Sequence, residues 1–199
     1  MHRHFVCRKH MELYLIEDYK EIHPGLKGPE LTDALVLDLL RESGKLPPVE
    51  ATPGQPVIER LPGGKPVLKL PQDPAASDPP EEEIHFSVSH TNETFGCVIA
   101  EQPIGFDLQV TRSVQILRMA RRYFTAEEIS YLEDSGEDAS ALEERFFRLW
   151  TRKEAYAKLT GEGLTAVLEG APVTGRDDLV FTDMNFGDGL YGCICTYED

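Results

Sequence analysis

The sequence predicts an α+β protein in which antiparallel strands pack on helices. Short strand-like runs follow one another closely within residues 84–110, and two more close the chain within 178–197. Helical patterning dominates the stretch between these two groups, within residues 113–160. Because strands and helices occur in separate runs instead of alternating, adjacent strands are expected to pair as hairpins, and a doubly wound parallel sheet is not expected.

The first hundred residues combine strand, helix and irregular patterns. An apolar run over 13–16 predicts a strand. Leu31, Leu35 and Leu39 recur every four residues, which predicts a helix over 29–44 that faces a core. Residues 44–80 contain ten prolines and little periodicity, so we expect a long irregular connection with one short strand over 66–70.

The remaining elements follow from alternation, helical spacing and turn residues. We expect strands over 84–88, 95–100 and 104–110, helices over 113–123, 126–133 and 141–160, and closing strands over 178–184 and 190–197. Turns are expected at 91–93, which contains Asn92, and at 185–189, where Asn, Asp and Gly are concentrated.

Composition narrows the classes of function. The chain has 199 residues and a formal net charge of −15, which argues against general binding of nucleic acid. No apolar run approaches the ~18 residues that cross a bilayer, and the start is too polar for a signal peptide, so no membrane partner is expected. Cys7, Cys97, Cys193 and Cys195 form no C-x-x-C pair, which favours buried free thiols and a cytoplasmic location.

The N-terminal residues His2, His4, Cys7 and His10 could be drawn as a metal cluster. Termini are usually loose, and no supporting element is expected around these side chains. We therefore expect no metal site there and leave the role of residues 1–10 open.

One long helix is expected to carry reactive groups. Trp150, Glu154 and Lys158 are spaced by four residues, so all three share one helix face. A solvent-exposed Glu–Lys ion pair is the simpler interpretation of that spacing. The aromatic residues Phe146 and Phe147 favour a packed helix instead, with the carboxylate and amine at the rim of a cleft.

A second acid interrupts a strand. Asp107 and Gln109 share one strand face, whereas Phe106 and Leu108 point the other way. Asp107 and Glu154 from separate elements are the pair of carboxylates that a Mg²⁺ site needs when water and phosphate complete the octahedron. A capping or ion-pair role for Asp107 is the alternative.

Two further motifs could hold phosphate. Ser89-His90 ends a strand, and Gly63-Gly64-Lys65-Pro66 combines backbone freedom with a cation. Taken alone, a hydrogen-bonded turn histidine is the simpler interpretation of His90, and Gly63-Gly64-Lys65-Pro66 is a weak signal.

The order of these motifs resembles the 4′-phosphopantetheinyl transferases, specifically the larger surfactin-synthetase type. The resemblance spans residues 63–164: Gly-Lys-Pro, a strand ending in Ser-His, Gly-Phe-Asp, then Trp-Thr-x-Lys-Glu-Ala-x-x-Lys and Gly-Glu-Gly-Leu. It implies two similar α+β halves, here 1–103 and 104–199 with a boundary near Pro103, an active site between them, and a monomer. Members of the larger type often serve secondary metabolism.

The resemblance implies a reaction and roles for residues. The phosphopantetheine arm of coenzyme A would pass to a serine of an acyl or peptidyl carrier protein, releasing adenosine 3′,5′-bisphosphate. Asp107 and Glu154 would bind Mg²⁺, with Mn²⁺ as an alternative ion. Glu154 would also act as base, and Lys158 would contact the phosphate. Coenzyme A would be bound by further residues that match the family's motifs, namely Lys65, Ser89, His90 and Lys153.

Two positions depart from the family pattern. Gln109 stands where many members carry a second acid, so we expect a metal ligand of lower charge and looser Mg²⁺ binding. The first helix, at 31–35, lacks the basic residues that usually hold the nucleotide, and Lys27 is a candidate substitute. Both departures leave open an alternative, a non-catalytic relative that binds carriers or coenzyme A; a Mg²⁺ phosphohydrolase is a further one.

A basic stretch predicts where the carrier docks. Residues 108–126 contain no acid but carry Arg112, Arg118, Arg121 and Arg122. An acidic carrier helix would complement this surface, with Met119, Tyr123 and Phe124 as apolar contacts. A solvated helix face balanced by Glu127 and Glu128 is the alternative.

Overall fold

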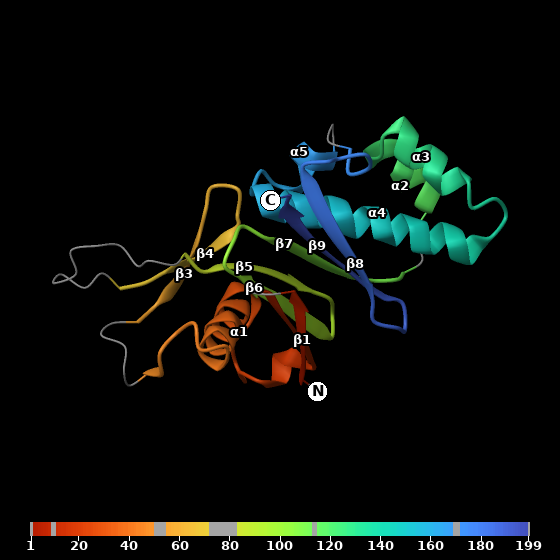
Figure 1. Ribbon diagram of the computed structural model, residues 1–199. Coiled ribbons are helices and arrows are strands. Elements are labelled where there is room, and N and C mark those ends of the chain that lie inside the picture. The colour runs from red at the N-terminus through yellow and green to blue at the C-terminus, as the bar shows by residue number, and fades with distance from the viewer. Residues whose placement is uncertain are drawn as a thin grey trace.

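The computed structural model describes residues 2–8, 11–49, 55–71, 83–112, 115–168 and 172–198. Its elements form four layers, helix on sheet on sheet on helix, from α1 to α4 (Figure 1). The α+β prediction with antiparallel sheets is therefore confirmed. The division into halves at Pro103 stays a prediction.

The first sheet has four antiparallel strands in the order β1-β2-β6-β5. Helix α1 (Gly28–Glu42) covers one face of it and buries the predicted leucines Leu31, Leu35 and Leu39. The strands are β1 (His2–Arg8), β2 (Met11–Glu17), β5 (His85–His90) and β6 (Thr94–Ala100). A short 3₁₀ turn, η1 (Tyr19–Glu21), links β2 to α1.

The second sheet has the order β7-β9-β8 and carries α4 (Ala139–Thr160) on its outer face. Its strands are β7 (Gly105–Val110), β8 (Leu179–Asn185) and β9 (Leu190–Tyr197). The two sheets pack together through a fully apolar layer in which Leu13 and Val98 meet Phe106 and Ile194.

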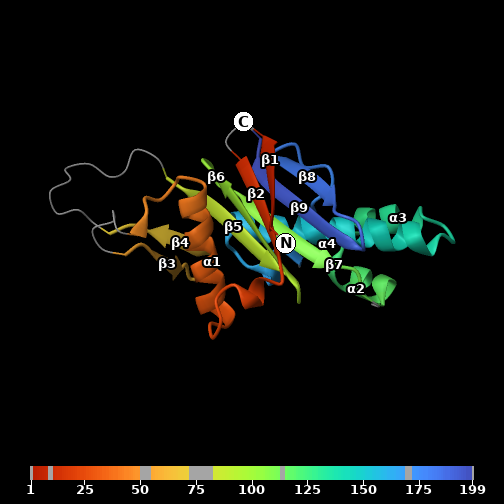
Figure 2. The same cartoon turned by 90° about the horizontal axis from the view of Figure 1, so that it is seen from below.

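Smaller elements lie at opposite ends of the molecule (Figures 1 and 2). At one end is the hairpin of β3 (Val57–Arg60) and β4 (Pro66–Lys69). At the other end, α2 (Ile116–Tyr123) and α3 (Ala126–Glu133) pack on the first half of α4 through aromatic side chains. Helix α5 (Leu164–Leu168) follows α4.

Three local expectations need correction. The N-terminal residues are not a loose tail, because β1 pairs with β2 along its length. The region expected to hold one short strand contains two, since β3 pairs with β4. Helix α5 was not predicted. Each is short and carries no strong local periodicity, so pairing or packing with a neighbouring element stabilises it.

Two other expectations concern cysteines and the metal cluster. Cys97, Cys193 and Cys195 are free and buried, as predicted, whereas the side chain of Cys7 lies outside the described residues, as do those of His2 and His10. The His4 ring stacks on Tyr14 and lies 3.0 Å from Glu12. Among the described side chains, no three or more His, Cys, Asp or Glu residues gather as a metal site. In the same part of the chain, no helix has the length and apolar composition to cross a membrane.

Candidate active site

A cavity of about 500 Å³ opens where the two sheets meet the C-terminal half of α4. Side chains from α1, the β3–β4 turn, β5, β7 and α4 line it. The lining includes all but one of the residues predicted for catalysis, metal and coenzyme A: Lys65, Ser89, His90, Asp107, Gln109, Glu154 and Lys158. The exception is Lys153.

Strand alternation and one glycine place Asp107 beside α4. Phe106 and Leu108 enter the layer between the sheets, so Asp107 points to the opposite face. On that face, a Cβ at Gly105 would lie 1.9 Å from the carbonyl oxygen of Ala155. Only glycine permits this approach of β7 to α4, which brings Asp107 within reach of Lys158.

The Asp107 carboxylate accepts hydrogen bonds from three elements. Its Oδ1 accepts from Ser89 Oγ on β5 at 2.8 Å and from Lys158 Nζ on α4 at 2.8 Å. Its Oδ2 accepts from Gln109 Nε2, on its own strand, at 3.1 Å. The residue is only 1% exposed, so these charge-assisted bonds compensate the burial of its charge and fix its orientation.

Glu154 lies in the same cavity with a pKa raised to about 7 from an ordinary value near 4.5. Burial is the largest cause, and the negative charge of Asp107 adds to it. Lys158, a hydrogen bond from Trp150 and the charge of Arg112 act in the opposite direction. Trp150 therefore both packs in the aromatic core and contacts the carboxylate four residues ahead.

These carboxylates suit a hard divalent cation. Two mutually repelling carboxylates from β7 and α4 line one cavity, and their oxygens are the donors that Mg²⁺ prefers. Gln109 turns its amide nitrogen, not its carbonyl oxygen, toward Asp107. In this arrangement Gln109 orients the Asp107 carboxylate, and its predicted role as a metal ligand stays a prediction.

The predicted coenzyme A contacts differ in what they touch. Lys65 Nζ donates to the carbonyl of Leu159 at 2.7 Å, so it caps the end of α4, and burial lowers its pKa. Ser89 is committed to Asp107. His90 is exposed at the end of β5, with its ring 5.9 Å from that of Tyr19.

His90 also borders a second cavity of about 480 Å³. This cavity shares Thr32 and His90 with the first, and its lining adds Lys20 and Lys27. Lys27 directly precedes α1, as the sequence suggested for a substitute cation, while Lys20 on η1 was not predicted. Lys20 and Lys27 are thus two cations close to the start of α1, and the substitution of Lys27 for the basic groups missing from 31–35 stays a prediction.

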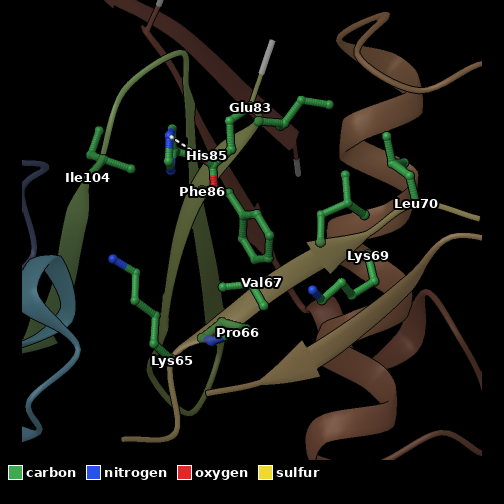
Figure 3. Close-up of a pocket in the computed structure, with 11 residues that line it drawn as sticks. Lys65, Pro66, Val67, Lys69, Leu70, Glu83, His85, Phe86 and Ile104 are labelled. Carbon is green, nitrogen blue, oxygen red and sulfur yellow. Dashed lines mark ion pairs between the residues drawn. The ribbon is translucent and has the colours of Figure 1, made fainter. Parts of the chain in front are cut away.

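A third cavity, of about 310 Å³, also borders Lys65 (Figure 3). Lys69 and His85 border it, with Phe86 and Val67 along its apolar wall. Glu83 lies 3.8 Å from His85. None of the predicted catalytic carboxylates lines this cavity.

Lys153 requires a correction. Its side chain is 1% exposed, and its ammonium lies 3.0 Å from Glu128 Oε2 and over the ring of Phe124. Glu128 in turn accepts from the backbone N–H groups of Thr125 and Val173. Lys153 therefore joins α3 to α4 inside the protein, and this geometry does not support the contact with coenzyme A that its motif implied.

The predicted carrier surface is mostly exposed. Arg118, Arg121 and Arg122 on α2 face solvent, and Met119 is half-buried. The prediction that Phe124 contacts the carrier is wrong, because this side chain is buried against Phe146 and is unavailable to a partner. Sequence reasoning also missed Thr32 and Arg60 in the cavity lining; Arg60 pairs with Asp33, and no local pattern marks either residue.

The family model and the curated relatives that match this chain carry the same family name. Residues 103–197 match the sequence model of the 4′-phosphopantetheinyl transferase superfamily. A 4′-phosphopantetheinyl transferase of Bacillus subtilis is 31% identical over 117 residues, which are 58% of this chain and 50% of the relative. The 4′-phosphopantetheinyl transferase HetI of Nostoc sp. (strain PCC 7120 / SAG 25.82 / UTEX 2576) is 33% identical over 119 residues, 59% of this chain and 46% of the relative.

The 4′-phosphopantetheinyl transferase Sfp of Bacillus subtilis (strain 168) is 32% identical over 96 residues, 48% of this chain and 42% of the relative. The chain is therefore similar to the 4′-phosphopantetheinyl transferase superfamily over residues 103–197, and to these transferases over the stretches given. It spans half or less of the length of these curated relatives.

Proposed function

We propose that this chain transfers the 4′-phosphopantetheine arm of coenzyme A to a serine of an acyl or peptidyl carrier protein, in a Mg²⁺-dependent reaction that releases adenosine 3′,5′-bisphosphate. The observation that carries the proposal is the meeting of Asp107, Glu154 and Lys158 in one cavity. Similarity to the named transferases supports the reaction class.

The reaction demands positioning and charge neutralisation more than covalent chemistry. Mg²⁺ held by Asp107 and Glu154 would supply positive charge on the pyrophosphate. Lys158, which lines the same cavity, supplies a further cation for the pyrophosphate. Ser89 and Gln109 keep Asp107 oriented, so the site is preorganised before substrate binds.

Glu154 is the proposed base for the carrier serine. A serine hydroxyl is a weak nucleophile until a neighbouring group takes its proton. A general base works best when its pKa lies near the working pH, and the raised pKa of Glu154, about 7, meets that condition in the protein without metal. The proton passes to the Glu154 carboxylate as the serine oxygen attacks the phosphorus.

The nucleotide end is assigned to the side of the cavity near His90. The cavity shared by Lys20, Lys27 and His90 gathers three basic side chains beside the first cavity. Phosphate binding by cations there would orient coenzyme A with its pyrophosphate toward Lys158. As the family resemblance implies, we propose that the protein acts as a monomer, and the buried free thiols fit action in the cytoplasm.

The decisive experiment is a mass measurement on an apo carrier protein incubated with coenzyme A, Mg²⁺ and this chain. We expect the carrier to gain ~340 Da, the mass of the phosphopantetheine arm. The gain should disappear with the Asp107→Asn variant. Since Gln109 replaces a family acid, a carrier- or coenzyme A-binding relative without activity is the alternative, which retained binding with no mass gain would support. Breakdown of coenzyme A without carrier would indicate a phosphohydrolase.

The exposed arginines of α2 are the proposed docking surface for an acidic carrier. Reversing one charge, in Arg118→Glu or Arg121→Glu, should raise the KM for the carrier roughly tenfold and leave coenzyme A binding near the original value. Steady-state kinetics with each substrate varied in turn measures both effects. Equal damage to the two KM values would contradict docking on α2, and Glu133→Gln on neighbouring α3 is a control that removes an exposed charge elsewhere.

A further inference from the structure

Lys158 occupies an unusual position between the two carboxylates. Its Nζ lies 2.8 Å from Asp107 Oδ1, and its charge also lowers the pKa of Glu154. The side chain is 30% exposed, whereas Asp107 is 1% exposed. The Lys158 ammonium is therefore more accessible than the carboxylate with which it pairs, and Ser89 and Gln109 also hold that carboxylate.

We propose that Lys158 is the counter-ion of the Asp107–Glu154 pair in the metal-free chain, and that its ammonium must leave Asp107 when a divalent cation binds. The proposal rests on the function proposed above and adds a role for Lys158 in controlling metal affinity. In this role Lys158 acts before the reaction begins, in addition to contacting phosphate during the reaction.

The charge balance explains why Lys158 has to move. Asp107, Glu154 and Lys158 together carry a formal charge of −1. A divalent cation placed among all three would give +1 and set two cations against each other in a partly buried site. With Lys158 displaced, the two carboxylates and the cation balance to zero.

The other donors to Asp107 are poor candidates for displacement. Ser89 is buried, and its hydroxyl also lies 3.5 Å from the Leu108 carbonyl. Gln109 is on the same strand as Asp107, bonds the other carboxylate oxygen and carries no charge. Lys158 has a flexible four-carbon stem in the last turn of α4 and can reorient without moving the backbone.

Displacement also links metal binding to substrate binding. An ammonium freed from Asp107 remains at the rim of the cavity, where the diphosphate of coenzyme A is proposed to lie. The anionic diphosphate of coenzyme A would stabilise the displaced Lys158 ammonium. Bound coenzyme A should therefore increase the affinity of the site for the divalent cation.

The test is calorimetric binding of Mg²⁺ and Mn²⁺ to the metal-free full chain at pH 8.5, above the pKa of Glu154. Removing the competing ammonium in Lys158→Met should tighten divalent-cation binding about tenfold, which is ~1.4 kcal/mol. Lys158→Arg, which keeps the positive charge, should stay near the original affinity. Lys69→Met is the matched control, because Lys69 lies outside this cavity.

Unchanged or weaker binding by a folded Lys158→Met variant overturns the proposal, and so does absence of binding by all variants. Circular dichroism and thermal melting verify that the variant is folded, and Lys158→Gln offers a second neutral side chain. The carrier mass assay is independent of this measurement. A chain that binds metal as predicted but modifies no carrier would retain the counter-ion role and lose the transferase function.

Discussion

Replacing Glu154 with glutamine should reduce transfer of phosphopantetheine by about 10³-fold or more. General-base catalysis alone contributes roughly 10²–10⁴-fold, and the same change removes one of two proposed metal-binding carboxylates. The amide preserves the size of the side chain and its place beside Trp150 and Asp107. Initial rates of carrier modification, followed by mass spectrometry, measure the loss.

The same variant has a second signature in the metal-free protein. The folded-state pKa of Glu154, about 7, exceeds its ordinary value near 4.5, so the folded chain holds the extra proton between these pH values. Stability from this group is then present at low pH and is lost as the pH rises from about 4.5 through 7. Glu154→Gln avoids the loss and should be more stable than the original chain by about 1–3 kcal/mol at pH 8.

Urea unfolding in the presence of a chelator, at pH 5 and at pH 8, checks this sign. The advantage of Glu154→Gln should be larger at pH 8. Glu133→Gln, an exposed change on α3, should show neither the loss of activity nor the pH-dependent gain. A Glu154→Gln variant that keeps most of its activity would contradict the assignment of Glu154 as the base. A variant that is less stable than the original chain at pH 8 would contradict the electrostatic interpretation.

The predictable part of the site has a local periodic signature. Spacing by four residues places Glu154 and Lys158 on one helix face, and strand alternation separates Asp107 from Phe106 and Leu108. These face assignments are predictable because they depend only on the geometry of the helix or strand, and not on its partners in the fold. The fold class followed for the same reason, since the order of strand and helix runs restricts which elements can pair.

The parts that sequence reasoning missed depend on partners that no local periodicity identifies. Strand β1 exists because β2 pairs with it, and β3 because β4 does. The sequence did not reveal that the amide nitrogen of Gln109 donates to Asp107, and a role for Gln109 as a metal ligand stays a prediction. Nor did it reveal that Lys65 donates to the carbonyl of Leu159, far along the chain, and the contact of Lys65 with the nucleotide stays a prediction too.

Lys153 illustrates the same limit within a single motif. It precedes Glu154 directly, so the motif alone predicts that both residues belong to the active site. One residue along a helix turns the side chain by about 100°, which sends Glu154 to the cavity and Lys153 to the interior. Its partner Glu128 caps α3 through Thr125, a capping box that the sequence contains but that does not reveal the lysine.

Lys153→Met should therefore destabilise the protein by about 3–5 kcal/mol, because it leaves the Glu128 carboxylate buried without its cation. The folded fraction should bind coenzyme A with its original affinity, since Lys153 does not line the cavity. Equilibrium unfolding in urea and calorimetric titration with coenzyme A measure the two quantities. The control is Lys45→Met, which breaks an exposed pair with Glu101 at 3.0 Å and should cost less than about 1 kcal/mol.

The double variant Lys153→Met with Glu128→Gln separates the charge from the packing. Glutamine can accept from one of the two backbone N–H groups, those of Thr125 and Val173, through its single carbonyl oxygen, and it no longer needs a counter-ion. It should recover part of the stability lost by Lys153→Met, because a buried unpaired charge costs more than a hydrogen-bonded amide. A single variant that unfolds normally yet binds coenzyme A tenfold more weakly would instead assign Lys153 to the substrate, as its motif first implied.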